Sequence, residues 1–173
     1  MTIHFESKSE ITLEKYLYWA GHPIGRNARK KLRTSNMINI FGILFSAVGG
    51  RFCLHLGSND IALIYGALLV AFVYKTFFHR KRANKKLYTQ TIIAQGGGVW
   101  MRTITFANNI QVSDGNTTST YKYSDFKKVS QDARHYLLFM NEDLVLRVEK
   151  GSFATGNEAD FLPFIKKRIK DKM

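Results

Sequence analysis

The chain has 173 residues, in which 26 Lys and Arg outnumber 13 Asp and Glu and give a net charge of +13. This length allows one ordinary soluble domain and little more, and the excess of positive charge favours a polyanionic partner, either nucleic acid or an anionic membrane face. The single cysteine, Cys53, excludes an internal disulfide framework.

The N-terminal segment, residues 1–36, is expected to contain a short strand and a juxtamembrane helix. Residues 2–7 alternate apolar Ile3 and Phe5 with polar neighbours, which predicts a strand. Because so short a strand is not stable alone, we expect it to pair with a C-terminal sheet and to direct Ile3 and Phe5 into the core of that sheet.

Residues 11–20 predict a helix with Thr12 as its N-cap. This helix carries three aromatic residues, Tyr16, Tyr18 and Trp19. They fit an anchor at the membrane interface as well as they fit core packing, and the sequence does not distinguish the two.

Two long apolar runs, at residues 37–56 and 61–78, predict a pair of transmembrane helices. About 20 residues at about 1.5 Å each cross the roughly 30 Å of a bilayer's hydrocarbon core. The turn-forming residues 57–60 leave room only for a tight connection, so the helices must be antiparallel neighbours. Neither run keeps a polar face over several turns, which disfavours the alternative of buried helices in a soluble bundle. Arg51 either snorkels to the headgroups or pairs with an acidic residue of a membrane partner.

Basic residues flank both runs, and the turn at 57–60 contains no Lys or Arg. The positive-inside rule therefore predicts a multi-pass protein with both termini in the cytoplasm, facing an anionic leaflet. Because topology accounts for the basic residues, nucleic-acid binding is not expected. The expected lipid contacts are Arg26, Arg29, Lys30, Lys31 and Arg33 before the first run, and Arg80, Lys81, Arg82, Lys85 and Lys86 after the second.

Small residues recur every four positions in both runs, a spacing that lets helix backbones approach closely. The pattern fits packing between the two helices of the hairpin, and it also fits a homodimer or docking onto another membrane protein. The residues are Gly42, Ser46 and Gly50 in the first run, and Ala62 and Gly66 in the second.

Residues 79–98 are expected to extend the second helix through the basic stretch and to end it at a linker of three glycines, 96–98. Beyond them, short strand patterns alternate with turn formers, which predicts an antiparallel β meander over residues 99–173. The expected strands are 100–106, 110–113, 117–123, 126–130, 136–140 and 144–148.

A C-terminal helix is expected at residues 157–170, with Asn157 as its cap. Pro163 should either delay its start or kink it. Its apolar face is Phe161, Ile165 and Ile169. The fold class is thus an α+β membrane protein, in which a two-helix transmembrane hairpin accompanies a cytoplasmic β meander closed by a C-terminal helix.

No residue set in the sequence has the spacing of a catalytic or metal site. The histidines at positions 4, 22, 55, 79 and 135 fall in different elements, and no i, i+4 pair stands beside an acid. Cys53 lies among apolar residues and is expected to be inert. We therefore expect no enzymatic activity and no cofactor.

Several motifs resemble those of the bacterial YcxB-like membrane proteins. They are TITFANNIQVSDG from Thr103, YKYSDFKKV from Tyr121, HYLLFMNEDLVLRVEKGSF from His135 and NEADFLPFIKKRI from Asn157. The stretch ITLEKYL from Ile11 is similar to the family's opening, whereas residues 149–153 match only partly. The resemblance implies a pleckstrin-homology-like (PH-like) roll for residues 99–173 and a place in the bacterial cell (inner) membrane, and it implies no biochemical activity.

Two functions are compatible with these expectations. The leading one is a non-enzymatic, membrane-anchored module whose cytoplasmic PH-like domain binds a protein or an anionic lipid headgroup. The alternative is a regulatory or protective, immunity-like subunit that contacts another membrane protein through the transmembrane hairpin.

Overall fold

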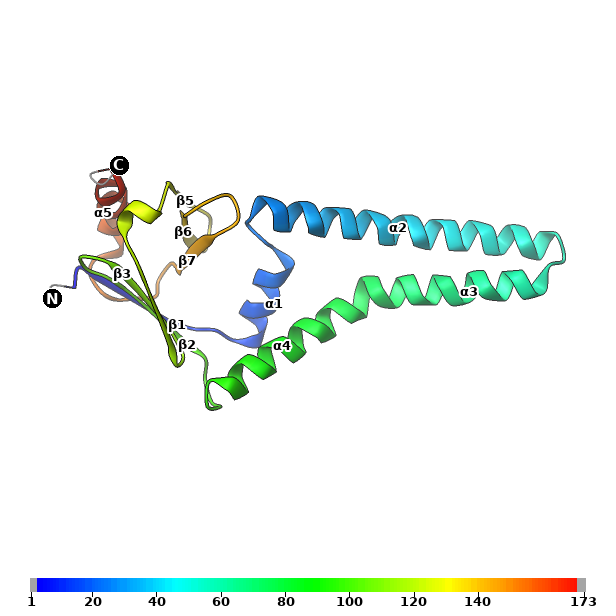
Figure 1. Ribbon diagram of the computed structural model, residues 1–173, viewed down its shortest axis with the longest axis horizontal. Helices are drawn as coiled ribbons and strands as arrows, with labels where there is room; N and C mark the ends of the chain where they lie inside the picture. Colours follow the sequence, from blue (N-terminus) through cyan, green and yellow to red (C-terminus); the bar gives the residue numbers. More distant parts are fainter. Residues whose placement is uncertain (1–2, 171–173) are drawn as a thin grey trace. The chain divides into compact units, whose positions relative to one another are not determined.

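The computed structural model describes residues 3–170, in an α+β arrangement with two long apolar helices and antiparallel sheets (Figure 1). Thr2 of the expected first strand and residues 171–173 of the expected C-terminal domain lie outside the described residues. The chain divides into two compact units. The sheet unit combines Met1–Asn27 with Gln90–Met173, and the hairpin unit is Ala28–Thr89.

The larger sheet of the sheet unit has five antiparallel strands in the order β4-β3-β2-β1-β8. The predicted pairing of the N-terminal strand with C-terminal residues is confirmed, since Phe5 lies opposite Phe106 and Glu10 lies opposite Met101. It is an interior strand of this sheet, because it lies between β2 and β8. The strands are β1 (Phe5–Glu10), β2 (Met101–Phe106), β3 (Ile110–Asp114), β4 (Thr117–Tyr121) and β8 (Phe153–Thr155).

The first strand begins later than the sequence predicts, and this corrects one expected core residue. Phe5 is 6% exposed and belongs to the core, as expected, but Ile3 precedes the strand and is 47% exposed. The next inward position is taken by Ser7, whose hydroxyl lies 2.6 Å from that of Ser152. A polar side chain is tolerated in this buried position because it is hydrogen-bonded there.

The predicted meander separates into two sheets. A second, three-stranded antiparallel sheet consists of β5 (Lys128–Gln131), β6 (His135–Phe139) and β7 (Val145–Glu149). The break follows β4, where the Asp125 carboxylate accepts a hydrogen bond from the Lys122 N–H at 2.8 Å and closes a 3₁₀ turn, η2 (Tyr123–Asp125). This turn buries Tyr123 and Phe126, so the predicted strands at 117–123 and 126–130 are both shorter than expected.

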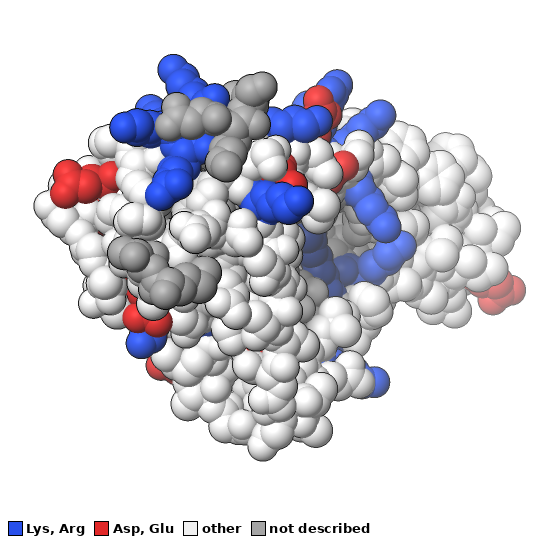
Figure 2. Space-filling view, turned by 60° about the vertical axis from the view of Figure 1, so that its left-hand side comes forward, with Lys and Arg blue, Asp and Glu red and all other residues white. Residues whose placement is uncertain are grey.

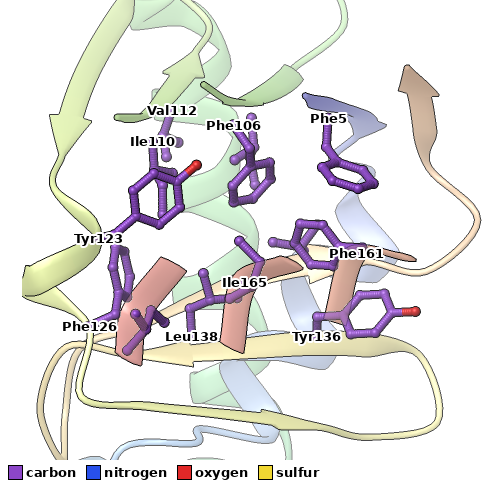
Figure 3. Packing of buried hydrophobic residues seen from close by; sticks show 13 residues of the cluster. Phe5, Phe106, Ile110, Val112, Tyr123, Phe126, Tyr136, Leu138, Phe161 and Ile165 are labelled. Carbon is purple, nitrogen blue, oxygen red and sulfur yellow. The ribbon is translucent and has the colours of Figure 1, made fainter. Parts of the chain in front are cut away.

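The C-terminal helix α5 (Glu158–Lys170) joins the two sheets through one aromatic core (Figure 3). Phe161 is fully buried, and its ring centroid lies 4.9 Å from that of Phe106 in the larger sheet and 5.0 Å from that of Tyr136 in the smaller one. The predicted apolar face of Phe161, Ile165 and Ile169 is confirmed, since all three residues are buried in this cluster.

The sequence makes two predictions for α5: that Asn157 caps it and that Pro163 disturbs it. Asn157 acts as expected, because its Oδ1 accepts a hydrogen bond from the Ala159 N–H at 3.2 Å. Pro163 lies inside the helix, which begins at Glu158, so of the two alternatives expected for it, a delayed start or a kink, the delayed start does not occur. Proline has no N–H to donate to the carbonyl four residues earlier.

Helix α1 (Leu13–Gly21) belongs to the sheet unit and packs on the rest of it through aromatic side chains. Thr12 is its N-cap, as predicted, and accepts a hydrogen bond from the Lys15 N–H at 3.3 Å. The Tyr16 ring lies 5.9 Å from that of Trp100, and the Trp19 ring lies 6.2 Å from that of His135. The guanidinium carbon of Arg134 lies 5.5 Å from the Tyr18 ring, so all three aromatic residues make contacts within this unit.

Helix α2 (Arg26–His55) begins well before the apolar run that predicted it, because the β6–β7 turn caps it. The Asp143 carboxylate accepts hydrogen bonds from the backbone N–H and the side-chain amide of Asn27, and the Arg26 N–H donates to the Glu142 carbonyl. A carboxylate at a helix N-terminus satisfies donors that have no partner inside the helix.

The second long helix runs over Asn59–Ala94, which confirms the predicted continuation through the basic stretch. It consists of α3 (Asn59–Tyr74), a π-helical turn η1 (Lys75–His79) and α4 (Arg80–Ala94). It is followed by the glycine linker, whose three residues all have positive φ, at 90°, 78° and 91°. Glycine adopts this conformation at no steric cost, so the predicted break is confirmed.

The two long helices are long and apolar enough to cross a membrane. Few of their residues are buried, and large side chains such as Phe41 and Leu63 are 71% and 73% exposed. A core helix of a soluble protein would have covered these side chains.

Candidate functional site

The ten basic residues expected to contact lipid lie at the start of α2 and at the start of α4, and all ten are exposed. Arg26 forms an exposed ion pair with Glu142 at 3.1 Å. Arg82 donates to the Tyr74 hydroxyl at 3.2 Å and lies over the ring of that tyrosine. Within the described part of the chain, Arg29, Lys30, Lys31, Arg33, Lys81, Lys85 and Lys86 form no ion pair.

A further basic group was not singled out in the sequence. The last turn of α5 carries Lys167, Arg168 and Lys170, and Figure 2 shows basic side chains gathered at this end of the sheet unit. Cations in the last turn of a helix also complement its dipole, so a structural role accounts for part of this group.

The small residues of the hairpin unit divide between covered and open positions. Gly42 and Ser46 of α2 are buried, and a Cβ at Gly42 would lie 2.6 Å from the Phe72 ring of α3. A Cβ at Gly50 would lie 3.3 Å from Tyr65, whereas one at Gly66 would meet nothing within 4 Å. Ala62 is half-buried.

Two polar atoms are buried on the covered side of α2. Within residues 3–170, Asn39 Oδ1 and Ser46 Oγ have no hydrogen-bond partner. Ser46 is one of the small residues singled out above, and Asn39 interrupts the first apolar run one turn before Gly42. Polar groups between apolar helices favour close contact between those helices.

A cleft of about 370 Å³ lies beside α1 in the sheet unit. One wall is the exposed side of α1, and the other is formed by the loop before β6 and the end of β7. Acidic, basic and aromatic side chains line it together: Thr12, Glu14, Lys15, Tyr18, Trp19, Arg134, His135 and Glu149. The Lys15 ammonium is bound to the Glu149 carboxylate at 2.8 Å.

Trp19, one of the residues that line this cleft, contacts two arginines from different sheets. The guanidinium carbons of Arg102 and Arg147 lie 5.4 and 5.5 Å from its ring. Arg102 is bound to the Asp114 carboxylate, and Arg147 donates to the His22 carbonyl at 3.0 Å. Burial lowers the pKa of Arg147, an effect that Asp132 and Tyr18 oppose. Such cation–π contacts hold the guanidinium planes in fixed positions.

His135 also lines the cleft and is buried, with 8% of its side chain exposed. Its Nδ1 lies 3.3 Å from Asp132 Oδ1, which also accepts the backbone N–H groups of Arg134 and His135. Partial burial acts to raise the pKa of Asp132, but these hydrogen bonds and the neighbouring imidazole outweigh it and hold the pKa below its ordinary value. Asp132 is therefore a carboxylate at neutral pH and fixes the orientation of the His135 ring.

Among the described residues, no group of three His, Cys, Asp or Glu side chains is placed to hold a metal ion. His135 and Asp132 are neighbours, but no third ligand joins them. Cys53 is half-buried in α2.

The segment that contains His135 is the part of the chain that matches a known protein family. Residues 107–164 match the YcxB-like protein family. The resemblance inferred from the motifs is confirmed for this segment. No curated protein and no solved structure matches the chain.

The YcxB-like segment supplies only one wall of the cleft. Arg134, His135 and Glu149 belong to it, whereas Tyr18 and Trp19 come from α1, outside the matched residues. The sequence signalled only the aromatic cluster of α1. The cationic residues could not be found by spacing, because the two sheets bring them together from β2, β7 and the loop before β6.

Proposed function

We propose that the chain is a non-enzymatic binding module anchored in the bacterial cell membrane by its helical hairpin. The observation that carries this proposal is the exposure of large apolar side chains along both long helices. Exposing so large an apolar surface to water is unfavourable, whereas the hydrocarbon core of a bilayer would cover it.

The orientation that we propose follows from charge. Basic residues near the starts of α2 and α4 flank the apolar runs, and the turn between the runs has none. Both termini then lie in the cytoplasm, where each basic residue near an anionic leaflet contributes about 1 kcal/mol of attraction. This arrangement makes the ten basic residues lipid contacts, with Arg26 the weakest because of its ion pair with Glu142.

The sheet unit is the part that we propose to bind a partner. Two antiparallel sheets closed by a C-terminal helix are what a PH-like roll would contain, and we propose that fold for it. Its ligand would be a protein or an anionic headgroup. The match to the YcxB-like family supports the relationship and carries no activity with it.

The hairpin unit also supports a second proposal, that the chain is a subunit of another membrane protein. Gly66 has open space beside it, and Arg51 is exposed on α2. A membrane protein that packs on Gly66 and places an acidic residue against Arg51 would make this chain a regulatory or protective subunit. Co-purification in a mild detergent would identify that partner.

Thiol labelling of intact cells tests the proposed topology. In a Cys53→Ser background, Ser58→Cys places a thiol in the turn between the long helices, and Thr155→Cys places one on exposed β8. We expect an impermeant maleimide to label the first variant only, and to label the second after the cells are permeabilised. Labelling of both in intact cells, or of Thr155→Cys alone, would contradict the proposed topology.

A further inference from the structure

We propose that the hairpin unit binds one phospholipid that carries two phosphate groups, held between Arg29 of α2 and the Lys81 and Lys85 side chains of α4. The inference deepens the proposed binding function and rests on it only in taking the hairpin to lie in a membrane. Three features support it: many cations without acidic partners, a π-helical turn that redirects two lysines, and exposed apolar side chains beside them.

The positive charge of the hairpin unit has almost no counter-charge within that unit. The unit contains eleven Lys and Arg and a single acidic residue, Asp60, which lies in the first turn of α3, at the opposite end from most of the cations. Arg29, Lys81 and Lys85 are exposed and form no ion pair with any described residue. Like charges gathered at one end of a hairpin repel one another, and a bound anion relieves that repulsion.

The two basic segments of the hairpin unit lie at similar heights. A Cβ at Gly42 would lie 2.6 Å from the Phe72 ring. Seven residues further along α2, a Cβ at Gly49 would lie 2.5 Å from the ring of Tyr65, which is seven residues before Phe72. Continued past η1, this antiparallel offset places the basic residues at the start of α2 level with those of α4, to within about one helical turn.

The π-helical turn η1 determines which side of α4 continues the face that α3 turns towards α2. The partly covered positions of α3 and η1 include Ala62, Tyr65, Leu69, Phe72 and Thr76. An uninterrupted α-helix would continue this row at residues 80, 83 and 87, but all three are exposed. Between residues 80 and 90 the partly covered residues are instead Asn84 and Tyr88, one position later, because the π turn takes up one extra residue.

This shift changes the side chains that lie next to the opening between α2 and α4. Lys81 and Lys85 flank the row of Asn84 and Tyr88, whereas Leu87, which would have continued the face of α3, is turned outwards and exposed. A single π turn inside an α-helix is unusual and is frequently found at functional sites. Here its effect is to bring two lysines to the side of α4 that faces the basic start of α2.

A lipid with two phosphates suits this arrangement. Beyond η1, α4 runs away from α2 (Figure 1), so the two basic segments are separated and no single phosphate contacts both. A headgroup with one phosphate for each segment makes its second contact within the complex, at a high effective concentration. Ile38, Phe77 and Phe78 are exposed on the membrane side of the cations, where acyl chains can lie against them.

Native mass spectrometry of the full chain in a mild detergent measures this binding. The protein is titrated with tetraoleoyl cardiolipin, and separately with dioleoyl phosphatidylglycerol at twice the molar concentration, so that the phosphate charge is equal. We expect one cardiolipin per chain, bound about tenfold more tightly than phosphatidylglycerol because its two phosphates are linked. If cardiolipin does not bind, or binds no more tightly than phosphatidylglycerol, the inference is overturned.

Variants at adjacent positions test whether the lipid lies between the two helices. Lys85→Gln and Lys86→Gln remove equal charges, but only Lys85 flanks the partly covered row of α4. We expect the first to weaken cardiolipin binding about fivefold, as the loss of one cation beside an anionic headgroup should, and the second by less than about twofold. Arg29→Gln and Lys30→Gln make the same comparison on α2, because Arg29 lies one turn from half-buried Leu32 and Lys30 lies on the opposite side.

Equal losses within either pair of variants would indicate a diffuse attraction and would overturn the inference. Circular dichroism of each variant verifies that the helices are intact. Lipid titration in detergent does not depend on the orientation of the chain in the cell, and thiol labelling does not depend on lipid binding, so the two proposals can fail independently.

Discussion

Tyr123 shows how one residue connects the two sheets to the core. The sequence suggested that it ends a strand, but it begins the 3₁₀ turn after β4 and is 2% exposed. Its hydroxyl donates to the Ala107 carbonyl at 2.9 Å, so the buried oxygen has a partner. Burial raises the pKa of Tyr123 to about 12, against the smaller opposing effect of the Arg168 cation.

This pKa predicts an alkaline limit to the stability of the sheet unit. The folded state favours the neutral phenol, so its contribution is complete below the ordinary pKa of about 10 and is lost as the pH rises towards 12. Tyr123→Phe should lower the free energy of unfolding by about 1 kcal/mol at neutral pH, because the hydrogen bond is lost. Between pH 10 and 12, however, the variant should lose less stability than the unchanged protein, because it has no phenol to ionise. Denaturant unfolding in nanodiscs at several pH values measures both. Equal alkaline slopes in the two proteins would contradict the assignment.

At the scale of elements, the glycines of the long helices can be separated by what lies beside them. Gly42 faces the Phe72 ring, while Gly66 faces open space, although the sequence placed both in one pattern of small residues. The spacing indicated that backbones could approach each other. It could not indicate which glycines face the other helix, because that depends on how each helix is rotated about its axis.

Alanine substitutions at these two glycines should have different effects on the stability of the helix pair. Gly42→Ala should destabilise the helix pair by about 1 to 3 kcal/mol, because the new methyl group would force Phe72 to move. Gly66→Ala should be neutral or stabilising by up to about 1 kcal/mol, since alanine favours helix and nothing obstructs it. Thermal unfolding in mild detergent, followed by circular dichroism, compares them. A loss with Gly66→Ala would instead indicate that a partner covers this face.

For the whole molecule, the central place of β1 makes the sheet unit depend on both ends of the chain. β1 pairs with β2 on one side and with β8 on the other, and Phe5 enters the core beside Phe161. Without β1, the larger sheet would lose an interior strand and expose two unpaired edges. The hairpin unit is thus inserted in sequence between two parts of one fold.

This insertion predicts which fragments fold. Residues 1–27 joined to 90–173 by a flexible Gly/Ser linker should form a cooperatively unfolding domain, because both parts of the sheet unit are present. Residues 90–173 alone should not, since they lack β1 and Phe5. Dispersion of amide resonances in ¹H–¹⁵N spectra distinguishes the two. A well-dispersed spectrum from the shorter fragment would show that β1 is dispensable.

Local patterns were sufficient for the features that depend on neighbours in sequence. The long helices follow from their apolar runs, the cap of α1 from Thr12, the break after α4 from three glycines and the buried face of α5 from its spacing. Each of these results from backbone preference or from periodicity along one element. The motifs were likewise enough to identify the YcxB-like segment, because they are read along the chain.

Other features required the folded chain, because they depend on residues far apart in sequence. Asp143 starts α2 from 116 positions away, and β1 is in register with β2 across nearly a hundred residues. The division into two sheets depended on how Tyr123 and Phe126 reach the core, which alternation alone does not encode. The cleft depends on this most of all: Trp19, Arg134 and His135 carry no shared motif, and they meet only because α1 packs against strands whose pairing is set by the whole sheet unit.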